Sequence, residues 1–136
     1  MNVPANCKYT KDHEWLKIDG EYAFIGITDF AQHELGDIVF VEVETVGETL
    51  GKHESFGTIE AVKTVSDMFM PVSGEILEFN ETLTTKPETI NQDPYGNGWV
   101  IKIKITSPDE IAELLDPSQY QAVSYTHLTL PTNREV

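Results

Sequence analysis

Short runs of β-branched and aromatic residues, separated by glycine and polar turns, recur along most of this chain. Regularly spaced runs of this kind predict an antiparallel β-sandwich or barrel. The clearest one alternates between apolar and basic residues, so that Trp99, Ile101, Ile103 and Ile105 share one face. The predicted strands are residues 14–18, 22–27, 38–43, 56–62, 65–70, 74–79 and 99–105.

Two of these runs carry a more specific prediction. The dipeptide Asp19-Gly20 favours a tight turn, and it joins residues 14–18 and 22–27 into a hairpin. Residues 38–43 are almost continuously apolar, which predicts a strand buried on both faces over part of its length.

The predicted helices are short and peripheral to the strands. Residues 28–35 form the first, with Thr28 or Asp29 capping its start and Gly36 suited to the left-handed position after its end. A second helix is expected near the C-terminus.

The second predicted helix begins after Ser107. Ser107 can accept a hydrogen bond from the amide three residues on, Pro108 suits the first helical position, and Glu110 completes a capping box. Asp116-Pro117 ends this helix, and Ser118 is expected to cap a short successor that runs through residue 123.

Bulk properties exclude several classes of protein. The 136 residues suit one domain, and the formal net charge of −14 opposes binding to nucleic acid or to anionic membranes. No apolar run reaches the roughly 18 residues that span a membrane, and residues 1–10 lack a secretory or transit signal. Cys7 is the only cysteine, so the chain forms no internal disulfide and a cytoplasmic location is expected. The four histidines lack zinc-like spacing, and no phosphate-binding glycine loop is present.

The C-terminal segment differs in character from the rest of the chain. Residues 124–136 are polar, lack a clear period and contain the only arginine. We interpret them as a disordered or non-native tail, which leaves residues 1–123 as the folded domain.

Lys63 lies between the strand-like runs 56–62 and 65–70. A lysine at such a hairpin tip projects away from the body of the protein, with its ammonium group in water. Most lysines in this position are simply solvated. A functional role for Lys63 therefore has to be inferred from the residues around it.

Those residues resemble the lipoylation site of glycine cleavage H proteins, where the pattern is close to Glu-Ser-Val-Lys, Ser-Asp and Pro-Val-Ser-Gly-Glu. The corresponding segments here are Glu60-Ala61-Val62-Lys63, Ser66-Asp67 and Pro71-Val72-Ser73-Gly74-Glu75-Ile76. Further likeness, in the same order along the chain, covers residues 9–15, 26–32, 35–41, 94–104 and 107–115. The resemblance spans residues 4 to about 123.

The chain also departs from the family pattern. Ala61 stands where serine is common, and residues 68–70 are more apolar than usual. Some relatives place a histidine just before the leucine of the short helix, where this chain has Glu34, with His33 one residue earlier. A histidine role is therefore not carried over to this helix.

The resemblance implies a mainly β fold: a lipoyl/biotinyl-carrier-like barrel-sandwich of two antiparallel sheets, with short peripheral helices and a C-terminal helix. It implies that Lys63 is joined by an amide to lipoic acid, and that the chain is a carrier and not an enzyme. The expected partners are the glycine decarboxylase (P protein), the aminomethyltransferase (T protein), the dihydrolipoyl dehydrogenase (L protein), and a lipoate ligase or lipoyl/octanoyl transferase. The expected form is a monomer in the bacterial cytoplasm.

Roles for four further residues follow from the same resemblance. The aminomethyl group on the lipoyl arm carries an amine, which is cationic near neutral pH, so a cleft with a carboxylate is expected to hold it. Glu14 and Asp67 are the candidates by motif position, with Asp12 as a secondary one. Glu60 is expected to help the lipoylating enzyme recognise the site.

Three other functions stay open at this level. An H-like protein that relays lipoyl groups mainly to other lipoate-dependent enzymes would show the same motifs. A biotin carrier also uses a hairpin lysine, but Val62 and Thr64 occupy the places where that family has methionines. An interaction domain without a cofactor would leave Lys63 unmodified.

Overall fold

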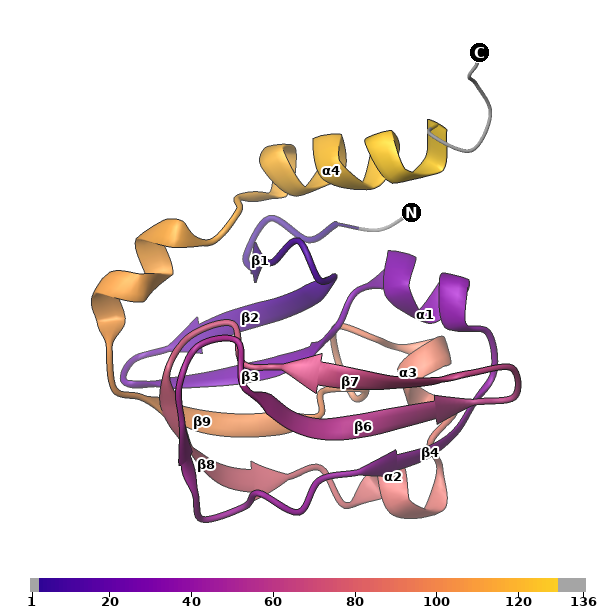
Figure 1. The fold of residues 1–136 in the computed structure, drawn as a ribbon, viewed down its shortest axis with the longest axis horizontal. Helices are drawn as coiled ribbons and strands as arrows, with labels where there is room; N and C mark the ends of the chain where they lie inside the picture. The colour runs from indigo at the N-terminus through magenta and orange to yellow at the C-terminus, as the bar shows by residue number, and fades with distance from the viewer. Residues whose placement is uncertain (1–2, 130–136) are drawn as a thin grey trace.

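The computed structural model describes residues 3–129, and the side chains of residues 3–123. Its strands form two antiparallel sheets, one of six strands in the order β1-β2-β3-β9-β8-β5 and one of three in the order β4-β6-β7 (Figure 1). The strands are β1 (Lys8–Tyr9), β2 (Glu14–Asp19), β3 (Tyr22–Ile27), β4 (Ile38–Glu42), β5 (Thr49–Leu50), β6 (Ser55–Ala61), β7 (Val65–Phe69), β8 (Gly74–Phe79) and β9 (Ile101–Ile105).

Short helices lie around these sheets, as predicted, and α4 lies along the top in Figure 1. The prediction of a mainly β protein with two antiparallel sheets is confirmed, although the sheets form a sandwich and not a closed barrel. The helices are α1 (Asp29–Leu35), α2 (Thr82–Thr85), α3 (Thr89–Gln92), the 3₁₀-helix η1 (Pro108–Glu113) and α4 (Pro117–Thr129).

The core lies between the two sheets and follows from the alternation of the sequence. Ile101, Ile103 and Ile105 of β9 are buried, as their shared face predicts. They pack in one cluster with Ile59 and Met68 from the other sheet. Trp99 does not share this face: it precedes the strand and packs against Phe24 in a second cluster. The Asp19-Gly20 hairpin is also present, and Gly20 has the positive φ of 66° that this turn requires.

Strand β4 is less buried than its apolar sequence predicts. Val39 and Phe40 are each 47% exposed, whereas Ile38 and Val41 face the core. The prediction of burial on both faces is wrong at these positions, because Phe40 lies on the outer face of the three-stranded sheet, where its cross-strand neighbours Glu60 and Val65 are also exposed. A β-bulge between Ile38 and Phe40 also turns Val39 outward.

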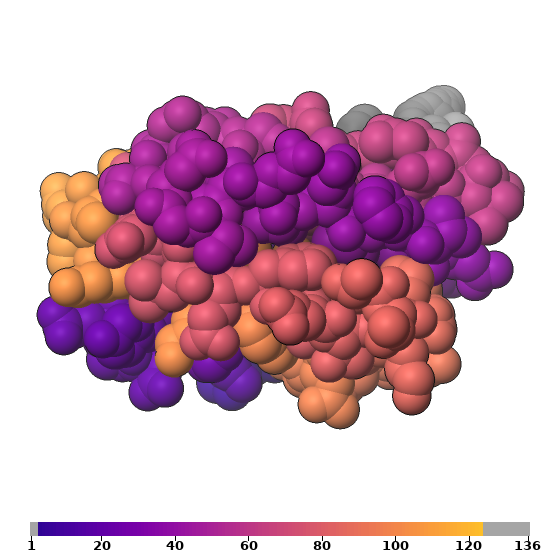
Figure 2. Space-filling model, turned by 90° about the horizontal axis from the view of Figure 1, so that it is seen from below, coloured from indigo at the N-terminus to yellow at the C-terminus, as the bar shows by residue number. Residues whose placement is uncertain are grey.

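The chain after β4 crosses to the other sheet. The amide of Gly47 donates to the carbonyl of Ile76 at 2.8 Å, and the amide of Ile76 donates to the carbonyl of Glu48 at 2.9 Å. Figure 2 shows this purple segment lying against the salmon-coloured chain of β8. These contacts close one side of the sandwich.

The predicted capping box at Ser107 does not form. Residues 108–113 form the 3₁₀-helix η1, and the Ser107 side chain makes no capping hydrogen bond. The Glu110 carboxylate instead accepts hydrogen bonds from the backbone amide and the hydroxyl of Ser73, at 2.6 and 3.1 Å. Glu110 thus bonds to Ser73, which is distant in the sequence, instead of to the start of its own helix, because Ser73 offers two hydrogen-bond donors.

The last helix starts earlier and ends later than predicted. Asp116, and not Ser118, caps α4: the Asp116 carboxylate accepts from the Gln119 amide at 2.8 Å, and the Gln119 side chain accepts from the Asp116 amide at 3.0 Å. The helix continues to Thr129, so the first part of the expected tail is helical. Residues 130–136 lie outside the described part of the chain, and the domain boundary at residue 123 stays a prediction.

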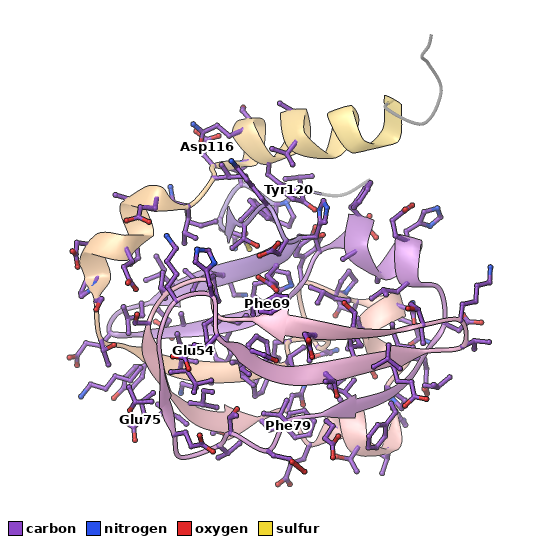
Figure 3. All side chains as sticks on the ribbon, in the orientation of Figure 1. Glu54, Phe69, Glu75, Phe79, Asp116 and Tyr120 are labelled. Atoms are coloured by element: carbon purple, nitrogen blue, oxygen red, sulfur yellow. The ribbon has the colours of Figure 1, made fainter. Side chains whose placement is uncertain are left out.

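Tyr120 fastens α4 to the body of the protein. Its ring is fully buried and stacks on the ring of Tyr9 in β1, with centroids 4.8 Å apart. Figure 3 shows Tyr120 extending from α4 toward β1. Among the helices of the described residues, none is long and apolar enough to cross a membrane.

Close packing of Trp15 fixes the start of β2. The buried indole donates from Nε1 to the carbonyl of Pro94 at 2.9 Å, and its ring lies over Gly26 of β3. A Cβ on Gly26 would lie 2.7 Å from Trp15 Nε1. Only glycine therefore leaves room for this indole.

We expect Gly26→Ala to lower the free energy of unfolding by about 2 kcal/mol, because overpacking a rigid core costs about 1–3 kcal/mol. Gly51→Ala is the matched control, since a Cβ there would approach only the end of the flexible Glu54 side chain. Urea denaturation of both variants measures the two losses. Losses of equal size would contradict this account.

Candidate functional site

Lys63 lies at the tip of the hairpin that joins β6 to β7 (Figure 1). The amide of Ala61 donates to the carbonyl of Thr64 at 2.8 Å and closes the turn. The amide of Val62 donates to the carbonyl of Asp37 at 3.1 Å and anchors the tip to the chain before β4. The Lys63 side chain is exposed, so its amine is accessible to another protein.

The strand that follows Lys63 leads to a cleft of about 180 Å³. Its walls are the start of β2, one side of α1 and the edge strand β7. The cleft brings together the predicted residues Glu14, Asp67 and Asp12, whereas Glu60 lies outside it. The lining residues are Asp12, His13, Glu14, Ile27, Phe30, Ala31, Glu34, Leu35, Ile59, Ser66, Asp67 and Met68.

Glu14 is the one fully buried carboxyl group of this cleft, with 3% of its surface exposed. Its Oε2 accepts a hydrogen bond from the amide of Phe69 at 2.8 Å, and its Oε1 accepts one from the hydroxyl of Thr10 at 3.1 Å. Figure 3 labels Phe69 at the end of β7. The Glu14 side chain thus connects β2 to the backbone of β7 in the other sheet.

Burial raises the pKa of Glu14 from 4.5 to about 8, although the hydrogen bonds from Phe69 and Thr10 oppose the rise and the nearby charge of Asp12 adds to it. At neutral pH the folded protein therefore holds Glu14 largely as the neutral acid. The Asp67 side chain is exposed and lines the same cleft.

A hydrogen-bonded chain behind the cleft was not predicted from the sequence. The Tyr120 hydroxyl lies 2.8 Å from Nδ1 of His13 and 2.7 Å from the hydroxyl of Thr28. Thr28 caps α1 as predicted, through a bond from the Ala31 amide at 3.2 Å. Tyr120 therefore joins both walls of the cleft, at the start of β2 and at the start of α1.

The sequence contains no signal for this arrangement, but the structure shows an unusual backbone conformation there. His13 has a positive φ of 67°, an unfavourable backbone conformation for a residue with a Cβ. Its ring packs against the ring of Phe30, with centroids 4.5 Å apart, and this packing stabilises the conformation. Contacts between residues so distant in the sequence cannot be read from local patterns.

The raised pKa of Glu14 predicts how stability depends on pH. Between about pH 4.5 and 8 the carboxyl keeps its proton in the folded protein but loses it in the unfolded chain, so stability falls as the pH rises through this interval. Glu14→Gln removes the titrating group. We expect the free energy of unfolding of the variant to exceed that of the wild type by on the order of 5 kcal/mol above pH 8, and by much less at pH 4.

Urea denaturation at a series of pH values measures this difference. Two curves that run parallel across the whole interval would rule out a raised pKa at Glu14.

Comparisons with known proteins agree with this architecture. The family model described as glycine cleavage H-protein matches residues 7–127. The glycine cleavage system H protein of Bacteroides thetaiotaomicron is 57% identical over 123 residues, which cover 90% of this chain and 98% of that protein. The protein of the same name from Chlorobium luteolum is 59% identical, with coverage of 89% and 96%.

A solved structure gives the same result. The crystal structure of a glycine cleavage system H protein from Mycobacterium marinum superposes with a TM-score of 0.81 at 42% sequence identity. The match covers 88% of this chain and 97% of that one. The family model, the relatives and the shared fold agree, and the chain belongs to the glycine cleavage H-protein family.

Proposed function

We propose that Lys63 carries lipoic acid in amide linkage and presents it to the enzymes of the glycine cleavage system. As a member of the H-protein family, the chain is a lipoyl carrier of that system and not one of its enzymes. It passes an aminomethyl group from the P protein to the T protein, and electrons to the L protein. One observation carries the proposal: strand β7 connects an exposed lysine to a cleft with a buried carboxyl group.

The chemistry of attachment requires an accessible amine. Lys63 Nζ attacks the carbonyl carbon of an activated lipoyl group, the new C–N bond forms as the activating group leaves, and the amine loses a proton. The proposed donor is a lipoyl adenylate made by a lipoate ligase, or an acyl thioester used by a lipoyl/octanoyl transferase. The exposed hairpin tip permits the close approach that either enzyme needs.

The bound lipoyl group supplies a dithiolane that accepts the aminomethyl group and two electrons. The rest of the function depends on the chain itself. Asp67 follows Lys63 by four residues, which is at most about 13 Å at the rise of a β-strand, and a lipoyl-lysine arm would be long enough to reach back to it. The cleft walls from Ile27, Phe30 and Met68 are apolar and limit the access of water.

Glu14 and Asp67 are proposed to hold the ammonium group of the cargo. An approaching cation favours the ionised form of Glu14, so its pKa falls and the proton leaves to solvent. The resulting ion pair is charge-assisted and lies among apolar side chains, where it is stronger than in water. Asp67 and Asp12 add negative charge at the mouth of the cleft.

Residue Glu60 is proposed to serve recognition, since it lies exposed on β6 close to Lys63 and outside the cleft. We further propose that the protein acts as a monomer in the bacterial cytoplasm. Its formal net charge of −14 suits transient contacts with basic partner surfaces.

The attachment site is tested by the intact mass of protein produced with lipoate and a lipoate ligase. We expect the wild type to gain the mass of one lipoyl group, because Lys63 is exposed at a hairpin tip, and Lys63→Arg to gain none. Peptide mapping locates the adduct. An adduct on Lys52 or another lysine would reject the assignment.

The proposed role of Glu14 is tested by the lifetime of the loaded carrier. We expect Glu14→Gln to accept lipoate normally but to release its cargo about 10-fold faster, since a neutral amide cannot pair with the ammonium group. Release of ammonia in the absence of the T protein measures the rate. Glu88→Gln changes an exposed acid outside the cleft and is expected to match the wild type.

A further inference from the structure

The outer face of the three-stranded sheet carries exposed apolar side chains beside Lys63. Phe40, Glu60 and Val65 are direct cross-strand neighbours on β4, β6 and β7, and all three are exposed. Phe40 is 47% exposed and Val65 is 62% exposed. A carboxylate therefore lies between two apolar side chains in the row nearest the hairpin tip.

Two more side chains extend this surface. Val39 projects outward from the β-bulge, and Val62 of the hairpin tip is 72% exposed. We name the surface formed by Val39, Phe40, Val62 and Val65 around Glu60 the collar. In the described chain the other large exposed apolar side chains, Ile18, Tyr22 and Val46, lie on other elements. Apolar side chains gathered in this way mark an interaction site.

Acidic residues surround the collar on the same sheet. The next row on the same face, two residues further along each strand, contains Glu42, Thr58 and Asp67, and Asp37 precedes β4 at the other end. The collar thus combines an apolar surface, a central carboxylate and an acidic rim. A complementary partner has an apolar patch with one cation inside it and further cations around it.

We propose that the collar is the docking surface for the enzyme that attaches the lipoyl group to Lys63, with a cation of that enzyme paired to Glu60. This inference rests on the proposed lipoylation of Lys63 and specifies how the site is recognised.

The length of the reacting side chain distinguishes this enzyme from the other partners. An unmodified lysine is short, so the enzyme that acylates it has to bring its own surface against the hairpin tip and the adjoining strands. An enzyme that acts on the dithiolane meets the far end of a much longer arm. Contact with the collar is therefore obligatory only during attachment.

The apolar neighbours also make Glu60 a better recognition group. When an enzyme covers Phe40 and Val65, water is excluded from the pair formed by Glu60 and the partner cation. The attraction between the charges is then stronger than in open solvent. The apolar and ionic contacts should accordingly depend on each other.

The test uses steady-state lipoylation of the unmodified full chain by a lipoate ligase with lipoate and ATP, followed by intact mass. We expect Phe40→Ser with Val65→Ser to raise the KM for the carrier at least 10-fold and to leave kcat within about 2-fold, since a 10-fold loss corresponds to about 1.4 kcal/mol and is typical of a lost apolar anchor. Val46→Ser is the matched control, because Val46 is also 47% exposed. Melting temperatures confirm that the variants remain folded.

Coupling between the two kinds of contact gives a second readout. The effect of Glu60→Gln on KM should be several-fold smaller in the Phe40→Ser background than in the wild type. The inference fails if the collar variants match Val46→Ser, or if they alter the KM of the dihydrolipoyl dehydrogenase and not that of the ligase. Failure of the wild type to gain a lipoyl group on Lys63 would instead overturn the proposed function itself.

Discussion

The hydrogen bond between Glu14 and the amide of Phe69 is the contact on which the site depends. Glu14 begins β2 in the six-stranded sheet, and Phe69 ends β7 in the three-stranded sheet. The bond therefore crosses the sandwich, and it satisfies a backbone donor on an edge strand that has no further strand to pair with. Holding the two sheets together at this point keeps a carboxyl group buried, which raises its pKa to about 8. Glu14 therefore contributes both to the contact between the sheets and to the proposed function.

Much of the fold could be predicted from local patterns. The alternation in residues 101–105 predicts β9 and its buried face, and Asp19-Gly20 predicts the first long hairpin. The errors fall where a distant partner competes with a local rule. Glu110 bonds to Ser73 instead of capping its own helix, and Phe40 is exposed because the outer face of the three-stranded sheet is open at this row.

The site could be predicted only in part. The motif around Lys63 and the positions of Glu14 and Asp67 came from the family resemblance, and the structure places the two acids in one cleft. The sequence contains no sign that Glu14 is buried or that its pKa is raised, because both depend on strands that meet only in the folded chain. The contact between His13 and Tyr120 joins opposite ends of the domain and has no local signature.

The position of Tyr120 has a consequence for biosynthesis. The first strands of the protein leave the ribosome early, yet the hydrogen-bond partner of His13 lies 107 residues later in the chain, in α4. The chain through α4 must therefore be synthesised before β1, α1 and α4 can close around the Tyr120 ring. Strands β6 and β7, with the lysine between them, emerge well before that moment. During synthesis, the attachment hairpin can therefore form before the cleft beside it is complete.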